Sequence, residues 1–232
     1  MGETYKISGG GGSSEPSPES VAASAVSPRR PVWRSITREQ FLLREMRIVA
    51  GLRLQGLSDE ALVDEVVSQN LIQYPTLAMV GNIARTCLMR LDALGPAQSQ
   101  LTELLAQGTS TEVVQANLYA MMRTYAVVWE FMTQVVGERY RTLNNELARR
   151  DVNAFLARLQ QEVPQVAAWS ETTMAKTRQV LLNSLVKAGY LETARSTKLL
   201  PVLLEPALER AIRTNEDQTA LAAFDYFWGC EL

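Results

Sequence analysis

The sequence predicts an all-α fold, a compact multi-helix bundle with two helix-turn-helix-like segments that follow a disordered N-terminal tail. Apolar side chains recur at helical spacing from Thr37 almost to the C-terminus. Capping residues and glycines divide this pattern into segments of ordinary helix length. Runs with the alternation of a β-strand are nearly absent, and at most a short hairpin is expected around 190–198.

The chain divides into three parts by composition. Residues 1–35 are rich in Gly, Ser, Pro and Ala, and their prolines rule out a long helix. We expect a flexible tail that packs little, except near Trp33. The remainder is interpreted as an N-terminal helical region, 36–136, with the first helix-turn-helix-like segment, and a C-terminal helical region, 137–232, with a winged-helix-like segment.

Three helices are predicted at the start of the N-terminal region. Thr37 and Gln40 have the spacing of a capping box, and Gly56 lies where a left-handed residue ends a helix. Ser58 caps a second helix, whose acidic first turn suits the positive end of the helix dipole. The third helix runs over about 76–93.

Two more helices complete this region. The fourth is short and rich in leucine, and it ends at Gly108. The fifth begins at Ser110 or Thr111 and runs to Val136 through the most apolar stretch of the chain, which predicts the central core helix. We interpret its methionines and aromatic residues as core packing and not as a cofactor site.

The C-terminal region has a more polar pattern. Asp151 is expected to cap one helix, and Ser170 caps a second, which Gly189 closes. Two final helices are predicted over 199–212 and 217–228.

The residue types that are missing exclude several function classes. The chain has no histidine, so the commonest general base and the commonest transition-metal ligand are absent. Two isolated cysteines form neither a zinc site nor a disulfide framework, which favours the reducing cytoplasm. There is no phosphate-loop motif and no apolar run long enough to cross a membrane. We therefore predict no enzyme: no catalytic residue, metal, cofactor or small-molecule substrate.

The formal net charge of −2 is unevenly distributed. Residues 29–53 hold seven arginines and two glutamates, which gives +5, and residues 169–198 hold five basic and two acidic residues, which gives +3. The rest of the chain therefore carries −10. Either a basic face lies on an acidic body, or these are ordinary solvated helix faces. Arg149 and Arg150, beside Asp151, are interpreted as a solvated helix end.

Residues 170–198 are the strongest candidate for a nucleic-acid-binding segment. The helix can bury one apolar side while its first turns present short polar and basic groups to a major groove. Residues 187–191, Lys-Ala-Gly-Tyr-Leu, look like the exit of a winged helix-turn-helix into its wing. A plain amphipathic helix with a good cap is the alternative. The candidate DNA-binding residues are Thr172, Thr173, Lys176, Thr177, Arg178, Arg195 and Lys198.

A second candidate segment covers 58–91. Two helices with a turn around 70–75 have helix-turn-helix proportions, although a helical hairpin of the core explains the same pattern. Because arginine and amide side chains are sparse at the starts of both candidate helices, we expect salt-sensitive binding with little sequence specificity. The residues of this segment that would face a groove are Tyr74, Thr76, Asn82 and Arg85.

Four short blocks follow one another along the chain. They are Arg-Glu-Met-Arg-Ile-Val-Ala at 44–50, Asn70-Leu71 with Thr76 and Arg90-Leu91, Arg123 and Tyr125 with Glu130-Phe131, and Trp169 to Leu191 with Thr173, Lys176 and Arg178. By the order and spacing of these blocks, the chain over about 38–208 resembles the BrxA family of the bacterial BREX (bacteriophage exclusion) defence systems.

This resemblance implies a small helical BREX component, encoded beside a DNA methyltransferase, a large ATPase and an alkaline-phosphatase-like protein. It implies a fold like that of the RNA-binding antitermination factor NusB, with helix-turn-helix-like segments associated with double-stranded DNA. The expected partners are therefore duplex DNA and those other BREX components. Two alternatives remain open: a protein adaptor with an apolar patch on 200–208 or 224–228, and an RNA-binding module.

Overall fold

A computed structural model describes residues 1–2, 31–37 and 40–224 of the chain. The predicted all-α fold is confirmed. Most of the predicted tail, and residues 225–228 of the last predicted helix, lie outside the described residues. The helical elements in chain order are α1 (Leu43–Leu54), α2 (Asp59–Ser68), α3 (Leu77–Asp92), η1 (Gly95–Ala97), α4 (Gln98–Gln107), α5 (Ser110–Thr124), α6 (Ala126–Glu130), η2 (Phe131–Val136), α7 (Gly137–Arg141), α8 (Arg149–Glu162), α9 (Pro164–Ala167), α10 (Glu171–Lys187), α11 (Pro206–Thr214) and α12 (Gln218–Leu221).

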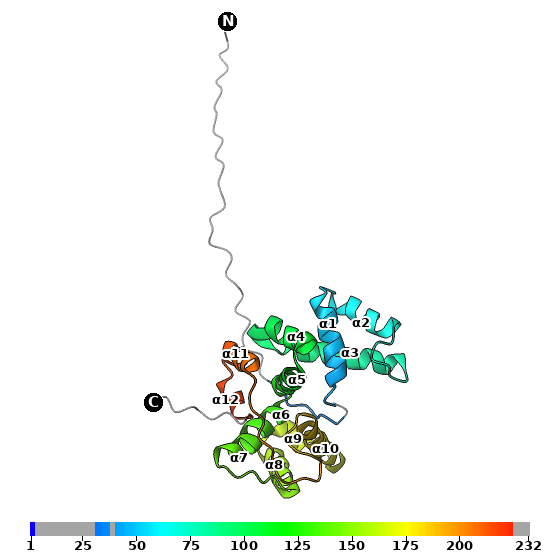
Figure 1. Cartoon of the computed structure of the whole chain (residues 1–232). Coiled ribbons are helices and arrows are strands. Elements are labelled where there is room, and N and C mark those ends of the chain that lie inside the picture. Colours follow the sequence, from blue (N-terminus) through cyan, green and yellow to red (C-terminus); the bar gives the residue numbers. More distant parts are fainter. Residues whose placement is uncertain (3–30, 38–39, 225–232) are drawn as a thin grey trace.

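The helices gather around the central pair α5 and α6. In Figure 1, α1–α4 lie above this pair, α7–α10 lie below it, and α11 and α12 lie along one side. Helix α1 packs against α3 and α4, and α10 packs against α8. Helix α11 packs on α4, α5 and η1, so the end of the chain returns to its N-terminal half. Of the helices that the structure describes, none combines the length and the apolar character needed to cross a membrane.

Several predicted helix boundaries are confirmed by their caps. The hydroxyls of Ser58, Thr76 and Ser170 each accept a hydrogen bond from the backbone N–H three residues later, at 3.2–3.3 Å. Gly56 and Gly189 both have φ of +82°, the left-handed conformation that glycine adopts without steric cost. These signals are local, because a cap bonds to the backbone of its own helix.

The predicted start of the first helix at Thr37 is wrong, since α1 begins at Leu43. Two buried side chains hold the segment that precedes it. The Asn117 amide donates to the carbonyl of Phe41 at 2.6 Å, and the Arg90 guanidinium donates to the same carbonyl at 3.1 Å. The segment is therefore anchored on the core before the helix begins.

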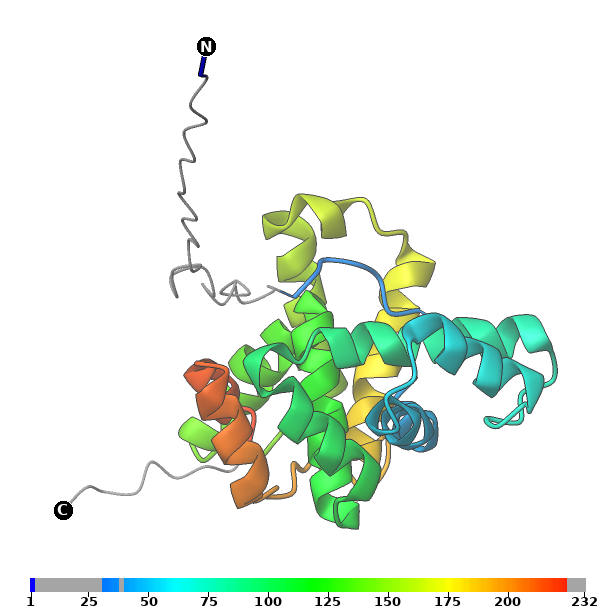
Figure 2. The same ribbon diagram turned by 90° about the horizontal axis from the view of Figure 1, so that it is seen from above.

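The predicted unbroken helix over 110–136 is also wrong. Tyr125, with φ −119° and ψ 114°, separates α5 from α6, and residues 131–136 form a wider π-helical turn. The segment 31–37, blue in Figure 2, passes beside the central helices. The Val32 N–H donates to the Thr124 carbonyl at 3.1 Å, and the Ala126 N–H donates to the Val32 carbonyl at 3.0 Å. Two backbone groups released by the break, the Thr124 carbonyl and the Ala126 N–H, are thus satisfied.

This pairing predicts a specific effect of proline at position 32. Val32→Pro removes the N–H donor to Thr124 and should lower the free energy of unfolding by about 1–2 kcal/mol. Val32→Ala keeps both backbone bonds and removes a side chain that is half-exposed, so it should cost clearly less. Urea unfolding of both variants measures the difference. Equal losses would mean that the backbone pairing contributes little.

The last predicted helices are shorter than expected. Residues 199–205 are not helical, because their backbone bonds elsewhere: the Leu199 N–H donates to the Asn145 carbonyl at 2.8 Å, and the Leu200 N–H to the Tyr190 carbonyl at 2.9 Å. Pro206 then opens α11 at its first position, where the missing N–H costs nothing.

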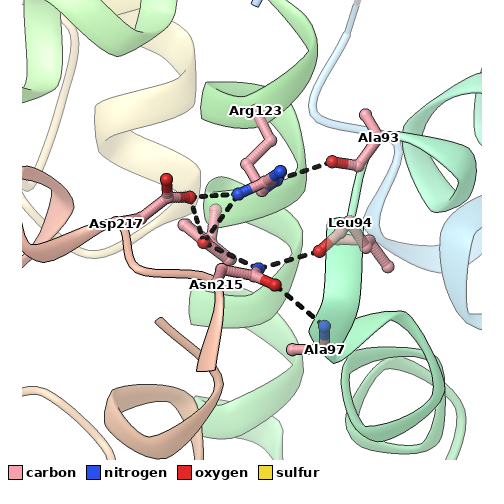
Figure 3. Close-up of polar contacts among 7 residues, drawn as sticks. Ala93, Leu94, Ala97, Arg123, Asn215 and Asp217 are labelled. Atoms are coloured by element: carbon pink, nitrogen blue, oxygen red, sulfur yellow. Dashed lines mark hydrogen bonds and ion pairs between the residues drawn. The ribbon is translucent and has the colours of Figure 1, made fainter. Parts of the chain in front are cut away.

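A buried polar cluster fixes the chain after α11 (Figure 3). The Arg123 side chain is 3% exposed and forms an ion pair with Asp217. Its Nε also donates to the Ala93 carbonyl at 2.6 Å, and the Tyr119 hydroxyl donates to the Asp217 carboxylate at 2.5 Å. Burial, followed by the nearby Asp217 carboxylate, raises the pKa of the Tyr119 phenol well above its usual value. The phenol therefore stays protonated and remains a donor.

Asn215 extends this cluster to the turn between α3 and α4. Its amide nitrogen donates to the Leu94 carbonyl at 2.8 Å, and its amide oxygen accepts from the Ala97 N–H at 2.8 Å. The same nitrogen lies 2.9 Å from the Tyr119 hydroxyl. One asparagine thus ties the end of α11 to both α5 and the α3–α4 turn (Figure 3).

Candidate nucleic-acid interface

Helix α10 has one buried face and one exposed face. Leu181 and Leu185 are buried, and Thr177 lies one turn before Leu181 on the same face, with no exposed surface. The prediction that Thr177 reaches DNA is therefore wrong, because its position belongs to the core side of the helix. Thr172 and Lys176 are exposed, as predicted for groups that face a ligand.

Two other predicted residues of α10 have contacts within the protein. The hydroxyl of Thr173 is 3.1 Å from that of Ser170, so it belongs to the helix cap. Arg178 is partly buried and donates from its guanidinium to the Asn153 amide oxygen at 2.7 Å. Because Asn153 lies on α8, this bond holds α10 against α8.

The expected hairpin and wing after α10 do not form. Residues 193–196 make a tight turn, and the backbones of Lys198 and Glu146 form an isolated antiparallel β-bridge. The Leu147 N–H donates to the Thr197 carbonyl at 2.6 Å as part of this bridge. The chain after α10 thus lies beside the loop that precedes α8, and the exposed Arg195 lines the same cavity as Arg149.

A cavity of about 510 Å³ lies where these segments meet, and we call it the basic groove. It runs along α10 between the start of α8 and the 193–196 turn. Its lining, as far as the chain is described, holds no aspartate or glutamate. Its uncharged polar residues are Thr172, Gln179 and Asn183. Its four cationic residues are Arg149, Lys176, Arg178 and Arg195.

A second groove, of about 560 Å³, lies on the opposite flank of α10. Thr37, Gln40 and Phe41 bound it on one side, and α10 contributes Lys187 together with the apolar Val180 and Val186. Its described lining is also without a carboxylate. Helix α10 therefore lies between two grooves, each of which is lined by at least one cationic side chain.

The α2–α3 segment has different electrostatics. Arg85 is exposed, but it lines a cavity of about 590 Å³ together with Asp59, Glu60, Asp64 and Asp92. The four carboxylates outnumber the two nearby arginines, Arg85 and Arg53, so this cavity would repel a phosphate backbone. Of the two candidate segments, only α10 therefore presents a surface with the charge that nucleic acid requires.

The other predicted residues of the α2–α3 segment fall into two classes. The Tyr74 hydroxyl donates to the Glu45 carboxylate at 3.2 Å, and burial, followed by this carboxylate, raises the pKa of Tyr74. Thr76 is the N-cap of α3. Asn82 is exposed on α3.

Several arginines of 29–53 also bond within the protein. Arg53 pairs with Asp59 at 2.8 Å and with Asp92 at 3.3 Å, and Arg47 donates to the Ala106 carbonyl at 3.3 Å. Arg29, Arg30 and Arg38 lie outside the described residues. Arg53 is therefore engaged in ion pairs on the protein surface and does not contribute a free basic face.

Sequence reasoning missed four residues of these two grooves. Lys176, Gln179 and Asn183 are spaced by three and four residues, so helical periodicity could have placed the two amides on the face of Lys176. Lys187 lies one turn further along the same helix. No sequence pattern around Arg149 indicates that it lies near α10, because only the backbone pairing of 145–147 with 197–199 brings it there.

Comparisons with known proteins agree over most of the chain. The BrxA family model matches residues 34–216. A BREX protein BrxA of Bacillus cereus (strain H3081.97) is 29% identical over 72% of this chain and 82% of its own length. A BREX protein BrxA of Escherichia coli O9:H4 (strain HS) is 26% identical over 80% of this chain and 85% of its own length. A crystal structure of a Magnetospirillum magneticum protein shares the fold, with a TM-score of 0.72 and 21% identity, over 84% of this chain and 100% of that one.

Proposed function

This chain belongs to the BrxA family of BREX components, and we propose that it binds double-stranded DNA as a non-catalytic subunit of its BREX system. The observation that supports this proposal is the basic groove, where four cationic side chains meet along α10 and the described lining has no carboxylate. Phosphate contacts supply most of the affinity of such interfaces.

Helix α10 has the features that a DNA-recognition helix needs. It is backed by a buried apolar side, it is capped at Ser170, and its exposed side carries Thr172 and Lys176. The major groove of B-DNA is about 12 Å wide and accepts an α-helix. With α10 in the groove, the cations on its flanks would approach the phosphates of the two strands. We assign the α2–α3 segment to packing.

Binding of a mixed-sequence duplex should fall steeply with salt. If all four cations of the basic groove contact phosphates, log Kd should change with log salt with a slope of about 3.6 in magnitude. Gel shifts or fluorescence anisotropy with the purified full chain from low to physiological salt measure this slope. No binding at about 50 mM salt, or a slope near zero, would contradict the proposal.

Two other functions make different predictions in the same assays. For an RNA-binding module, single-stranded or hairpin RNA should displace the duplex at equal concentration. For a protein adaptor, the chain should capture the methyltransferase, the ATPase or the phosphatase-like protein without DNA. Leu203 gives the adaptor some support, since it lies in the predicted apolar patch and is 71% exposed. Phe224, at the other predicted patch, is buried and belongs to the core.

A further inference from the structure

We propose that Gln179 and Asn183 read adenine bases in the major groove and give this protein a preference for a short adenine-containing sequence. The inference rests on the duplex-binding function proposed above and adds its specificity. It follows from where these two amides lie on α10, from what they do not bond to, and from the chemistry of the base edges.

Gln179 and Asn183 lie on the crest of α10, the line between its two grooves. Both are exposed, and, with Lys176, they line the basic groove and the second groove at once. A side chain that borders the cavities on both flanks of a helix must project from the line between them. Figure 1 shows α10 at the edge of the ribbon, near α8 and α9.

These amides differ from the structural amides of the protein. The Gln115 amide donates to the Leu203 carbonyl at 2.7 Å, and the Asn117 amide donates to the Phe41 carbonyl at 2.6 Å, both from buried positions. Within the described part of the chain, the side-chain amides of Gln179 and Asn183 form no hydrogen bond. Both ends of each amide can therefore bind another molecule.

An amide side chain has the donor and acceptor pattern that adenine requires. Its NH₂ group donates to adenine N7 while its oxygen accepts from the N6 amino group, a pair that no other base edge offers in the same way. Lys176, one turn earlier, can donate to guanine O6 and N7. The cationic side chains on either side of α10 would bind phosphates and so fix the position of the helix along the duplex. Phosphate contacts themselves carry no sequence information.

The spacing of these residues sets the length of the sequence that can be read. With about 1.5 Å of rise per residue, Gln179 and Asn183 are about 6 Å apart along the axis, and Lys176 and Asn183 are about 10 Å apart. At about 3.4 Å per base pair, the crest covers three to four base pairs. The sequence-based expectation of little specificity considered only the first turns of α10, and the exposed face extends two turns further.

The test is a selection from a randomised duplex library, followed by binding measurements on the enriched sequence. The parent chain should enrich a motif of about four base pairs that contains adenine. Gln179→Ala/Asn183→Ala should lose this preference, with at least about a 30-fold loss on the motif and less than about a twofold change on unrelated duplex. Gln161→Ala/Gln107→Ala removes the same chemistry from exposed sites on α8 and α4, and it should keep the preference.

A chemical change in the DNA gives an independent measurement. Replacing the motif adenines by 7-deazaadenine removes the N7 acceptor and keeps base pairing, so it should weaken parent binding and leave the double variant unchanged. If the parent binds duplex without preference, or if the double variant keeps the parent's preference, the inference is wrong while the proposed DNA binding stands. If the parent binds no duplex, both are wrong.

Discussion

Reversing two charges of the basic groove, in Lys176→Glu/Arg195→Glu, is expected to weaken duplex DNA binding by about 100-fold at low salt. Each reversal removes one charge-assisted phosphate contact and places a carboxylate where a phosphate would lie. The slope of log Kd against log salt should also become smaller in magnitude by about 1.8. These two residues are preferred to Arg178, whose bond to Asn153 joins α10 to α8 and complicates the result.

The matched control changes the net charge by the same amount elsewhere. Arg85→Glu/Arg210→Glu reverses two exposed cations, one on α3 and one on α11, and should reduce affinity only slightly. Circular dichroism and thermal melting of both double variants check that the fold is intact. Equal weakening by the two pairs would mean that overall charge, and not the basic groove, controls binding. Weakening by the control alone would shift the interface to α3.

Asp217→Ala is expected to produce the largest loss of stability, about 3–5 kcal/mol in the free energy of unfolding. The change leaves the guanidinium of Arg123 charged, almost completely buried and without its carboxylate, which is the costly way to break a buried ion pair. The Tyr119 hydroxyl loses its acceptor at the same time. Denaturant unfolding followed by circular dichroism measures the loss.

An exposed pair serves as the comparison for this variant. Glu162→Ala removes the partner of Arg158, in a pair whose side chains are 42% and 55% exposed, and it should cost less than about 1 kcal/mol. Asp217→Asn keeps an acceptor near Arg123 and should fall between the two. A loss for Asp217→Ala no greater than that for Glu162→Ala would show that the cluster does not anchor the end of the chain.

The sequence predicted the helical elements wherever the deciding interactions are local. Ser58, Thr76 and Ser170 cap the helices that they were expected to cap, and Gly189 closes α10. The break at Tyr125 had no such signal, because no proline or glycine interrupts the apolar pattern. The break instead depends on Val32, which is distant in the chain.

The candidate site was predictable in part for the same reason. The choice of α10 followed from its cap, its buried side and its cations, which are properties of one helix. The burial of Thr177 and the exposure of Gln179 depend on how α10 is rotated about its own axis relative to α8. The apolar pattern of the sequence constrains this rotation only loosely. Arg149 lines the groove because the backbone bridge between Glu146 and Lys198 brings the start of α8 beside α10. No sequence pattern indicates such a bridge.

The insertion of Val32 between α5 and α6 also bears on the order in which the molecule assembles. Contacts between distant positions close late, because the intervening chain must first lose its freedom. Until Val32 docks, the Thr124 carbonyl and the Ala126 N–H lack these partners. A continuous helix through Tyr125 would satisfy both groups in its place. Pairing of the N-terminal segment would then come late in folding and would set the angle between α5 and α6. The positions of α7–α10, which follow α6, would depend on that angle.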